Sequence, residues 1–193
     1  TLYGISKTWF EENCQDAGTL YVSVEIPADT EIIASYCMTN TYTEEKAGKG
    51  VVTEQDHLGT FEVVSVDFSK AAWLKTIGDY AFYNCTQLAG NFDMTHTEYL
   101  QTIGAYAFYN CANMTGSIDL SQSWELLEID DYAFYGCSKL TGILSFNENH
   151  GYAGQFQRIG DYAFYGCTGI QGMDLSKASS SLQEIGDYAF YGC

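Results

Sequence analysis

Basic residues are scarce in this sequence, which has 8 lysines and arginines against 25 aspartates and glutamates and a net charge of −17. Phosphate-rich nucleic acids need cationic protein surfaces, so we expect no nucleic-acid partner. The same excess of negative charge argues against binding to an anionic membrane surface. Cations, basic proteins and neutral glycans remain open as partners.

Long apolar runs are absent and proline is nearly absent. No stretch approaches the ~20 apolar residues that a membrane-spanning helix needs, so we expect no membrane insertion. With 1 proline and 19 glycines, the turns must be made by glycine, asparagine and aspartate. No signal peptide is visible and the first residue is threonine, which indicates a mature or trimmed chain.

Motifs for catalysis, metals and cofactors are missing as well. The three histidines, His57, His96 and His150, are far apart in predicted loops, and no hydroxyl or thiol lies in a nucleophile motif such as GxSxG. There is no CxxC pair, no cluster of cysteine and histidine for zinc, and no glycine-rich phosphate loop. We therefore expect no enzymatic activity, no cofactor and no metal centre.

The sequence does contain one nine-residue segment that occurs five times. IGDYAFYGC is found at 159–167 and 185–193, and close variants are found at 77–85, 103–111 and 129–137. The first isoleucines of the five segments, Ile77, Ile103, Ile129, Ile159 and Ile185, are separated by 26, 26, 30 and 26 residues. A fixed period in this range predicts a β-rich solenoid with one structural unit per coil.

Each repeat is predicted to contain two short strands and one short helical turn. The first strand alternates apolar and polar residues, as in Phe92-Asp93-Met94, and the second carries the Leu-x-x-Ile pair. Asp79 and its equivalents would cap the helical turn, and Asn84 or glycine would end it in the left-handed conformation. One cysteine closes each segment, which predicts a column of buried thiols, with disulfides between stacked coils as the alternative.

Two degenerate copies precede the regular ones. Ile33, with Met38 five residues later, marks one copy, and Ile5, with Leu2 three residues earlier, marks the other. We therefore expect a single domain of seven repeats over 1–193, with degenerate repeats in 1–41, a polar loop insertion at 42–60 and five regular repeats in 61–193.

The pattern L-x-x-I-G-x-x-A-F-x-x-C resembles the repeat of the BspA-like leucine-rich repeat family. It is carried by Leu74, Ile77, Gly78, Ala81, Phe82 and Cys85, and it recurs in four later copies. The 26-residue step is longer than the usual repeat of that family. The resemblance implies a curved solenoid, an extracellular or cell-surface location, and roles in adhesion or in host and matrix binding. It implies no catalytic residues.

Two columns of side chains are candidates for a binding surface. The first column is acidic, and its neighbouring carboxylates, at the spacing of paired strands, are expected to repel one another. This repulsion would raise the pKa values of the carboxylates or attract cations such as Ca²⁺. The alternative is a solvated acidic face without a ligand. The second is aromatic and suits contacts with proteins or sugar rings, although packing at the edge of the core is the alternative. The acidic candidates are Asp67, Asp93, Asp119 and Asp174, and the aromatic candidates are Tyr83, Tyr109, Tyr135, Tyr165 and Tyr191, beside a second column at Tyr80, Tyr106, Tyr132, Tyr162 and Tyr188.

Two N-x-S/T sequons, at Asn84 and Asn113, are candidate glycosylation sites if the source is eukaryotic. We interpret the chain as an extracellular or cell-surface protein that binds a protein or glycan ligand in adhesion and does not catalyse. The alternative is a structural protein whose solenoids associate end to end into an extracellular filament. This alternative depends on the two ends, Leu2 within a strand and Cys193 at the last residue of a repeat, because neither end carries a polar cap.

Overall fold

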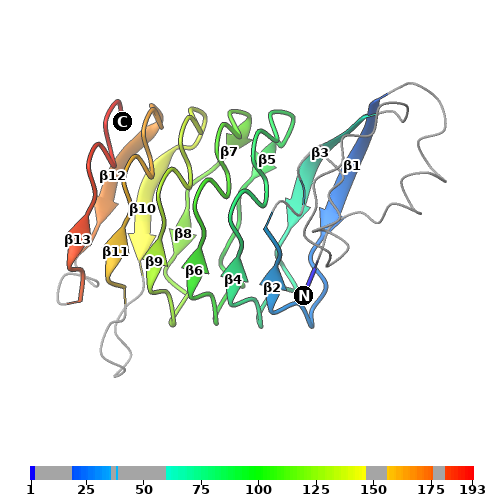
Figure 1. Ribbon diagram of the computed structural model, residues 1–193, viewed down its shortest axis with the longest axis horizontal. Helices are drawn as coiled ribbons and strands as arrows, with labels where there is room; N and C mark the ends of the chain where they lie inside the picture. The colour runs from blue at the N-terminus through cyan, green and yellow to red at the C-terminus, as the bar shows by residue number, and fades with distance from the viewer. Residues whose placement is uncertain (3–18, 36–37, 39–59, 147–155, 176–180) are drawn as a thin grey trace.

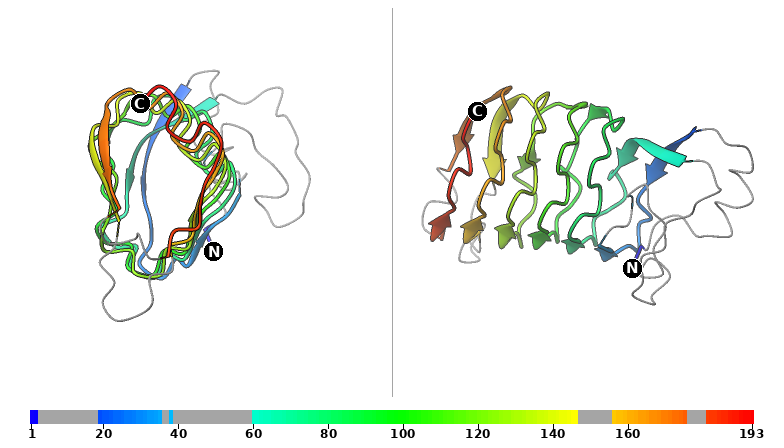
Figure 2. Two further views of the ribbon diagram at one scale, coloured as in Figure 1. Left: turned by 90° about the vertical axis from the view of Figure 1, so that its left-hand side faces the viewer. Right: turned by 45° about the horizontal axis from the view of Figure 1, so that its top comes forward.

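The computed structural model describes residues 1–2, 19–35, 38, 60–146, 156–175 and 181–193. The chain winds into coils that stack side by side in a row from the N-terminal to the C-terminal end (Figure 1). Viewed along the row, successive coils superpose and enclose a common interior (Figure 2). These features confirm the predicted β-rich solenoid.

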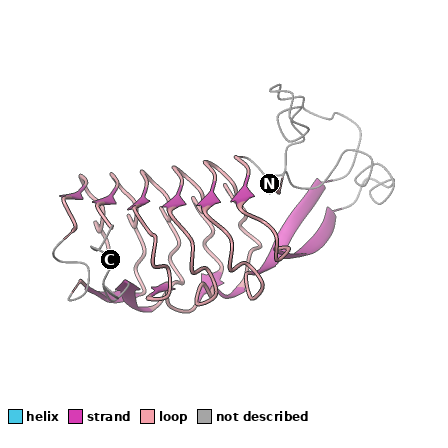
Figure 3. Cartoon of the chain, turned by 90° about the horizontal axis from the view of Figure 1, so that it is seen from below, coloured by secondary structure: helices cyan, strands magenta, loops and turns pink. Residues whose placement is uncertain are grey.

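One side of the solenoid is a parallel sheet of six strands, and each strand is two residues long. Their order is β13-β11-β9-β6-β4-β2, so each coil contributes one strand and pairs with the coil before and after it (Figure 3). In every pair the isoleucines of the repeated segment are in register. The strands are β2 (Ile32–Ile33), β4 (Thr76–Ile77), β6 (Thr102–Ile103), β9 (Glu128–Ile129), β11 (Arg158–Ile159) and β13 (Glu184–Ile185).

The opposite side is divided into three smaller parallel sheets. In order along the solenoid, β1 pairs with β3, β5 pairs with β7, and β10 pairs with both β8 and β12. The first alternating strand is shorter than predicted around Phe92, because β5 ends before that residue, although Phe92 and Met94 are buried and Asp93 is exposed as expected. The strands are β1 (Thr19–Glu25), β3 (Thr60–Asp67), β5 (Gly90–Asn91), β7 (Met114–Thr115), β8 (Asp119–Leu120), β10 (Gly142–Phe146) and β12 (Ile170–Asp174).

The interior is built from columns of like residues. The phenylalanine column of the repeated segment stacks ring on ring, with centroid separations of 4.9, 5.1, 5.2 and 5.3 Å from Phe82 to Phe190. Leucine and isoleucine columns pack beside it in one continuous hydrophobic core. Since each coil buries its apolar face only against neighbouring coils, stacking is what stabilises each repeat.

The prediction of a helical turn in each repeat is wrong, because the described residues contain no helix. The segment instead forms successive tight turns in which backbone N–H groups alternate between two kinds of acceptor. Tyr83 N–H donates to Tyr80 O within its own coil, whereas Phe82 N–H donates to Ala107 O of the next coil, at 3.1 and 2.7 Å. Bonding between coils replaces the helix because a coil in a solenoid has a backbone neighbour along its whole length.

The aspartates predicted to cap that turn also act between coils. Asp79 Oδ1 accepts a hydrogen bond from the backbone N–H of Ala105, which is in the next coil, at 2.9 Å. Asp161 Oδ1 accepts in the same way from Asp187 N–H at 2.7 Å. The carboxylates therefore stabilise the stacking of coils rather than the end of a helix.

The N-terminal copies follow the pattern only in part. Met38 is buried and its N–H donates to Ala81 O, in the place that Phe82 takes in the next coil. Leu2, however, forms the bridge with Ile33, so the register predicted from Ile5 is wrong by three residues. Ile5 and nearly all of the 42–60 insertion lie outside the described residues, and the expected total of seven repeats stays a prediction.

The cysteine column consists of free thiols, as the first alternative predicted. Cys85, Cys111, Cys137 and Cys167 are buried, and Cys193 is at the last coil. Each thiol donates to a main-chain carbonyl of a preceding coil, as Cys137 Sγ does to Phe108 O at 3.1 Å. Cys14 and Cys37 lie outside the described residues.

Candidate functional site

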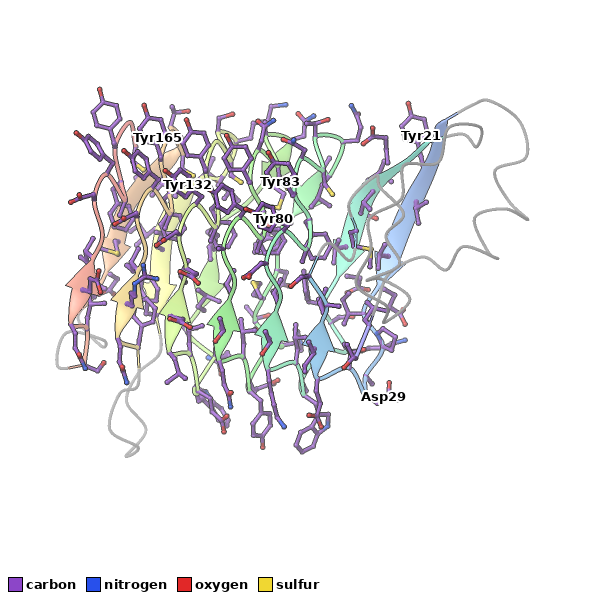
Figure 4. The ribbon with its side chains drawn as sticks, in the orientation of Figure 1. Tyr21, Asp29, Tyr80, Tyr83, Tyr132 and Tyr165 are labelled. Atoms are coloured by element: carbon purple, nitrogen blue, oxygen red, sulfur yellow. The ribbon has the colours of Figure 1, made fainter. Side chains whose placement is uncertain are left out.

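The tyrosines of the repeated segment form one continuous surface, which we call the tyrosine flank: Tyr80, Tyr83, Tyr106, Tyr109, Tyr132, Tyr135, Tyr162, Tyr165, Tyr188 and Tyr191. They lie in two columns along one edge of the solenoid, where Tyr83, Tyr132 and Tyr165 are labelled in Figure 4. Most of these side chains are half-buried, and Tyr188 and Tyr191 are exposed. The fold therefore brings together all five of the predicted aromatic candidates and their neighbouring column.

The rings of each column stack in parallel. In the candidate column the centroid separations are 5.0, 4.8, 4.8 and 5.1 Å, and in the neighbouring column they are 4.8, 4.7, 4.8 and 5.2 Å. Such separations with nearly parallel planes are those of offset-stacked rings. The two columns also contact each other within a coil, with Tyr132 and Tyr135 centroids 5.8 Å apart.

Three of the stacked phenols are harder to ionise than tyrosine in water. Burial raises the pKa of Tyr106, Tyr109 and Tyr162, and the neighbouring tyrosines of the columns raise it further. These three side chains are thus uncharged at physiological pH. The flank presents hydroxyl groups that both donate and accept hydrogen bonds.

The backbone beneath the flank is left-handed at two positions in each repeat. The second position is asparagine or glycine, with φ of 56° at Asn84 and 72° at Gly136, as the sequence predicts. The first position is tyrosine in all five copies, with φ between 56° and 58°. A non-glycine residue in this conformation costs about 1–2 kcal/mol. The stacked ring must offset that cost.

We therefore expect an unusual order of stability at Tyr132. Replacing this residue by alanine or by glycine removes the stacked ring and destabilises the fold in either case. The glycine variant should nevertheless be more stable than the alanine variant by about 1 kcal/mol, because glycine adopts φ of +58° without strain. Urea unfolding of both variants measures this difference. An alanine variant as stable as the glycine variant would contradict the account.

The acidic column has a structural role that the sequence analysis did not foresee. Asp67 Oδ1 accepts from Ser69 N–H at 2.8 Å, Asp93 Oδ1 from Thr95 N–H at 2.9 Å, and Asp119 Oδ1 from Ser121 N–H at 3.0 Å. Each aspartate thereby closes a turn with the residue two positions later. The signal was present in the sequence as a recurring Asp-x-Ser/Thr.

The predicted direction of the pKa shift is wrong at Asp67 and Asp93. The hydrogen bonds from Ser69 hold the pKa of Asp67 below its ordinary value, and those from Thr95 do the same for Asp93. Hydrogen bonds to the ionised form outweigh repulsion between the carboxylates. Strand pairing does align Glu25 with Asp67, but among the described residues no group of three or more acidic, cysteine or histidine side chains is arranged to hold a metal.

The two sequons occupy different environments. Asn84 is exposed, and its Oδ1 accepts from Asn110 Nδ2 at 3.0 Å. Asn113 is half-buried: its Nδ2 donates to Thr86 O at 2.7 Å, and its Oδ1 accepts from Lys139 Nζ at 2.6 Å. A glycan on Asn113 would displace the bond to Thr86, so Asn84 is the more accessible site. Glycosylation of either residue stays a prediction.

Two further results bear on the kind of function. His96, the one predicted loop histidine within the described residues, is exposed, and its Nδ1 lies 3.1 Å from Thr95 Oγ1. In the part of the chain that the structure describes, no helix is both long and apolar enough to cross a membrane.

Comparisons with known proteins identify the repeat. The sequence model of the BspA type leucine-rich repeat region matches six copies over residues 59–193. A search of curated proteins gives no match. The solved structure of a leucine-rich cell surface protein from Faecalibacterium prausnitzii A2-165 is 19% identical, with a TM-score of 0.46, and its match covers 88% of this chain. The chain corresponds to 39% of the length of that protein. Since the repeat model matches more than half of the sequence, the chain belongs to the BspA-type leucine-rich repeat family.

Proposed function

We propose that this chain is a non-catalytic binding module of an extracellular or cell-surface protein, and that its tyrosine flank contacts a protein ligand in adhesion. The family supports this in general terms, since leucine-rich repeat proteins commonly bind other proteins. Tyrosine is enriched at protein interfaces because it offers a large rigid contact area together with a hydroxyl group.

The tyrosine in the left-handed position is the observation that carries the proposal. The chain has asparagine or glycine, which tolerate the left-handed conformation, at the second left-handed position of each repeat. At the first position it has tyrosine in all five copies, although a non-glycine residue is energetically unfavourable in this conformation. Strained positions of this kind are concentrated at functional sites.

Ring orientation favours a protein ligand over a sugar at this flank. A ring in the middle of a column, such as Tyr106, has the rings of Tyr80 and Tyr132 stacked on its two sides. A sugar that stacks on an aromatic residue needs a free ring face, and the inner rings of the columns have none to offer in full. Ring edges and hydroxyls instead suit the mixed polar and apolar surface of a protein.

Binding to an array of purified extracellular matrix and cell-surface proteins tests the proposal. The test variant is Tyr109→Ser/Tyr135→Ser, which changes two adjacent rings of the candidate column. The control is Ile143→Ser, because Ile143 is 52% exposed on β10, outside the flank. Wild type and control should bind the same proteins, and the double variant should bind at least about tenfold more weakly.

Equal binding by the double variant and the control would contradict a role for the flank. Thermal unfolding of each variant shows whether it remains folded. A parallel screen of the wild type with ester, glycoside and peptide substrates tests the non-catalytic part of the proposal, and turnover of any of them would contradict it.

The alternative function is assembly of solenoids end to end into an extracellular filament. The regular pairing of each coil with the next through identical strand and turn bonds favours it, because a second copy could continue the same pattern. Negative-stain microscopy and light scattering at high protein concentration test it. Filaments would support assembly, and a single monomer mass at all concentrations would contradict it.

A further inference from the structure

A second group of aromatic side chains, which we call the aromatic corner, lies at a different place in the coil from the tyrosine flank. It consists of Trp73, Tyr99 and Trp124, in the turns that precede β4, β6 and β9. Trp73 and Tyr99 stack with ring centroids 4.9 Å apart and planes within 8° of parallel. The backbone N–H of Trp124 donates to Glu98 O at 3.0 Å, which places Trp124 in the adjoining coil.

These side chains leave much of their surface in water. Trp73 is 54% exposed and Trp124 is 49% exposed, so two of the three tryptophans of the protein are on the surface within three successive coils. Isolated exposed apolar residues are common on proteins. A run of them across adjoining coils indicates a binding surface.

The fold itself does not require aromatic residues here. The equivalent of Trp73 is Asp29 in the coil before it and Glu125 in the coil after Tyr99, since all four lie three residues before their strand in the six-stranded sheet. The same turn is therefore built with carboxylates elsewhere in the chain. Packing of the solenoid gives no reason for an indole at Trp73.

Carboxylate oxygens border the aromatic surface. Glu98 precedes Tyr99, and its Oε2 is buried without a hydrogen-bond partner. Glu125 Oε2 accepts from Gln101 Nε2 at 2.7 Å, and Asp29 is exposed. The Glu98 oxygen is covered by protein atoms, so the exposed Asp29 and the half-buried Glu125 are the carboxylates that a ligand can reach.

We propose that the aromatic corner binds a neutral glycan. One side of the Trp73 indole stacks on Tyr99. The equivalent residue in the coil on its other side is Asp29, which is not aromatic. This ring, unlike the inner rings of the flank, therefore has a face for the apolar side of a sugar. Sugar hydroxyls donate to Asp29 and Glu125 at the rim. Aromatic walls with a few convergent polar groups are typical of small-ligand sites.

The charge and the size of the corner narrow the class of glycan. A net charge of −17 opposes anionic polysaccharides, which leaves neutral ones. Three coils span two steps of ~4.8 Å, or about 10 Å, which suits a short stretch of an oligosaccharide chain rather than a single sugar. The site is separate from the tyrosine flank, so it does not depend on the proposed protein ligand.

Titration calorimetry and tryptophan fluorescence with cellohexaose, maltohexaose and mannohexaose test the proposal, with polygalacturonate as the anionic control. The wild-type chain should bind at least one neutral oligosaccharide and should not bind polygalacturonate. Trp73→Asp, which copies the residue that the chain has at position 29, should weaken that binding by about tenfold or more. Trp73→Ala is the second variant, in case the added charge disturbs the fold.

Ile143→Ser is the matched control, because Ile143 is exposed to the same extent as Trp73 but lies on β10. It should bind the oligosaccharide as the wild type does. Absence of binding to all three neutral oligosaccharides, or unchanged affinity in both Trp73 variants, would overturn the proposal. The flank variant Tyr109→Ser/Tyr135→Ser should keep its sugar binding, so failure of one proposal is distinguishable from failure of the other.

Discussion

Combining Asp130→Gly with Ala105→Asp is expected to give a protein within about 1 kcal/mol of wild-type stability, although each change alone should be clearly destabilising. The reason is an exchange of hydrogen-bond partners between coils. Asp131 N–H donates to Asp130 Oδ1 of its own coil at 2.8 Å. In three other coils the equivalent N–H, that of Ala105, Asp161 or Asp187, donates to an aspartate of the preceding coil.

Glycine is what makes room for the aspartate of the preceding coil. A Cβ on Gly104 would lie 2.5 Å from Asp79 Oδ1 and 2.8 Å from the Asp79 nitrogen. Gly160 and Gly186 are crowded in the same way by Asp131 and Asp161. Asp130 takes the place of the glycine in the one regular coil whose predecessor has Ala105 instead of aspartate. From Gly104 onward the chain thus has either glycine above aspartate or aspartate above alanine, whereas Gly78 lies above Ser35 and is crowded by backbone atoms alone.

Each single change breaks this pairing. Asp130→Gly leaves Asp131 N–H without its acceptor. It also removes one ion-pair partner of Arg158, whose Nη1 lies 2.6 Å from Asp130 Oδ1. The free energy of unfolding should fall by about 2 kcal/mol. Ala105→Asp places a carboxylate against the Cβ of Asp130 and should cost about 2 kcal/mol through overpacking and like charge. The double variant restores an acceptor for Asp131 N–H, as in the neighbouring coils, but not the ion pair of Arg158 with Asp130.

Urea unfolding of the wild type, both single variants and the double variant gives the coupling energy directly. We expect the two changes to compensate each other by about 3 kcal/mol. Additive losses, with the double variant less stable than either single variant, would show that the carboxylate does not move between coils as described.

The second large effect is a steep loss of stability at alkaline pH. Burial raises the pKa of Cys137 from 9.0 to about 12, and it raises the pKa of Cys111 and Cys167 as well. Between pH 9 and about 12 the unfolded chain releases the Cys137 proton while the folded chain retains it. The stabilisation is complete below pH 9, and each pH unit above this value should lower the free energy of unfolding by about 1.4 kcal/mol for this thiol alone.

Urea unfolding under reducing conditions, from neutral pH to about pH 11, measures this slope. The half-buried tyrosines with raised pKa act in the same direction, so the variant Cys137→Ala is needed to isolate the thiol. It should reduce the slope by about 1.4 kcal/mol per pH unit. A slope that is the same with and without Cys137 would contradict the burial of a protonated thiol.

Periodicity in the sequence was sufficient to predict the solenoid, the isoleucine sheet and the buried phenylalanine and cysteine columns. Each of these follows from one residue type at one position in every coil. The prediction of a helical turn was wrong because an aspartate followed by asparagine or glycine is equally compatible with tight turns. In these turns the aspartate and the backbone bond to the next coil. Asp79 bonds to Ala105 rather than within its own coil, and single-repeat reasoning does not contain that neighbour.

The two surfaces were predictable to different degrees. The tyrosine flank was visible as ten residues at two repeated positions, but the left-handed backbone at Tyr80 and its equivalents was not, because tyrosine has no preference for it. The aromatic corner was missed altogether. Trp73 and Trp124 are at different positions of their repeats, so a comparison of equivalent positions does not group them.

The most direct test of the binding account is nitration of the flank tyrosines with and without a protein ligand found on the array. Mass spectrometry of peptides reports Tyr109 and Tyr135 separately from Tyr21, which is 63% exposed on β1 and serves as the internal control. We expect saturating ligand to slow nitration of Tyr109 and Tyr135 by about tenfold while Tyr21 reacts at its original rate. Unchanged nitration of Tyr109 and Tyr135 under saturating ligand would show that the ligand binds elsewhere and that the tyrosine flank is not the binding surface.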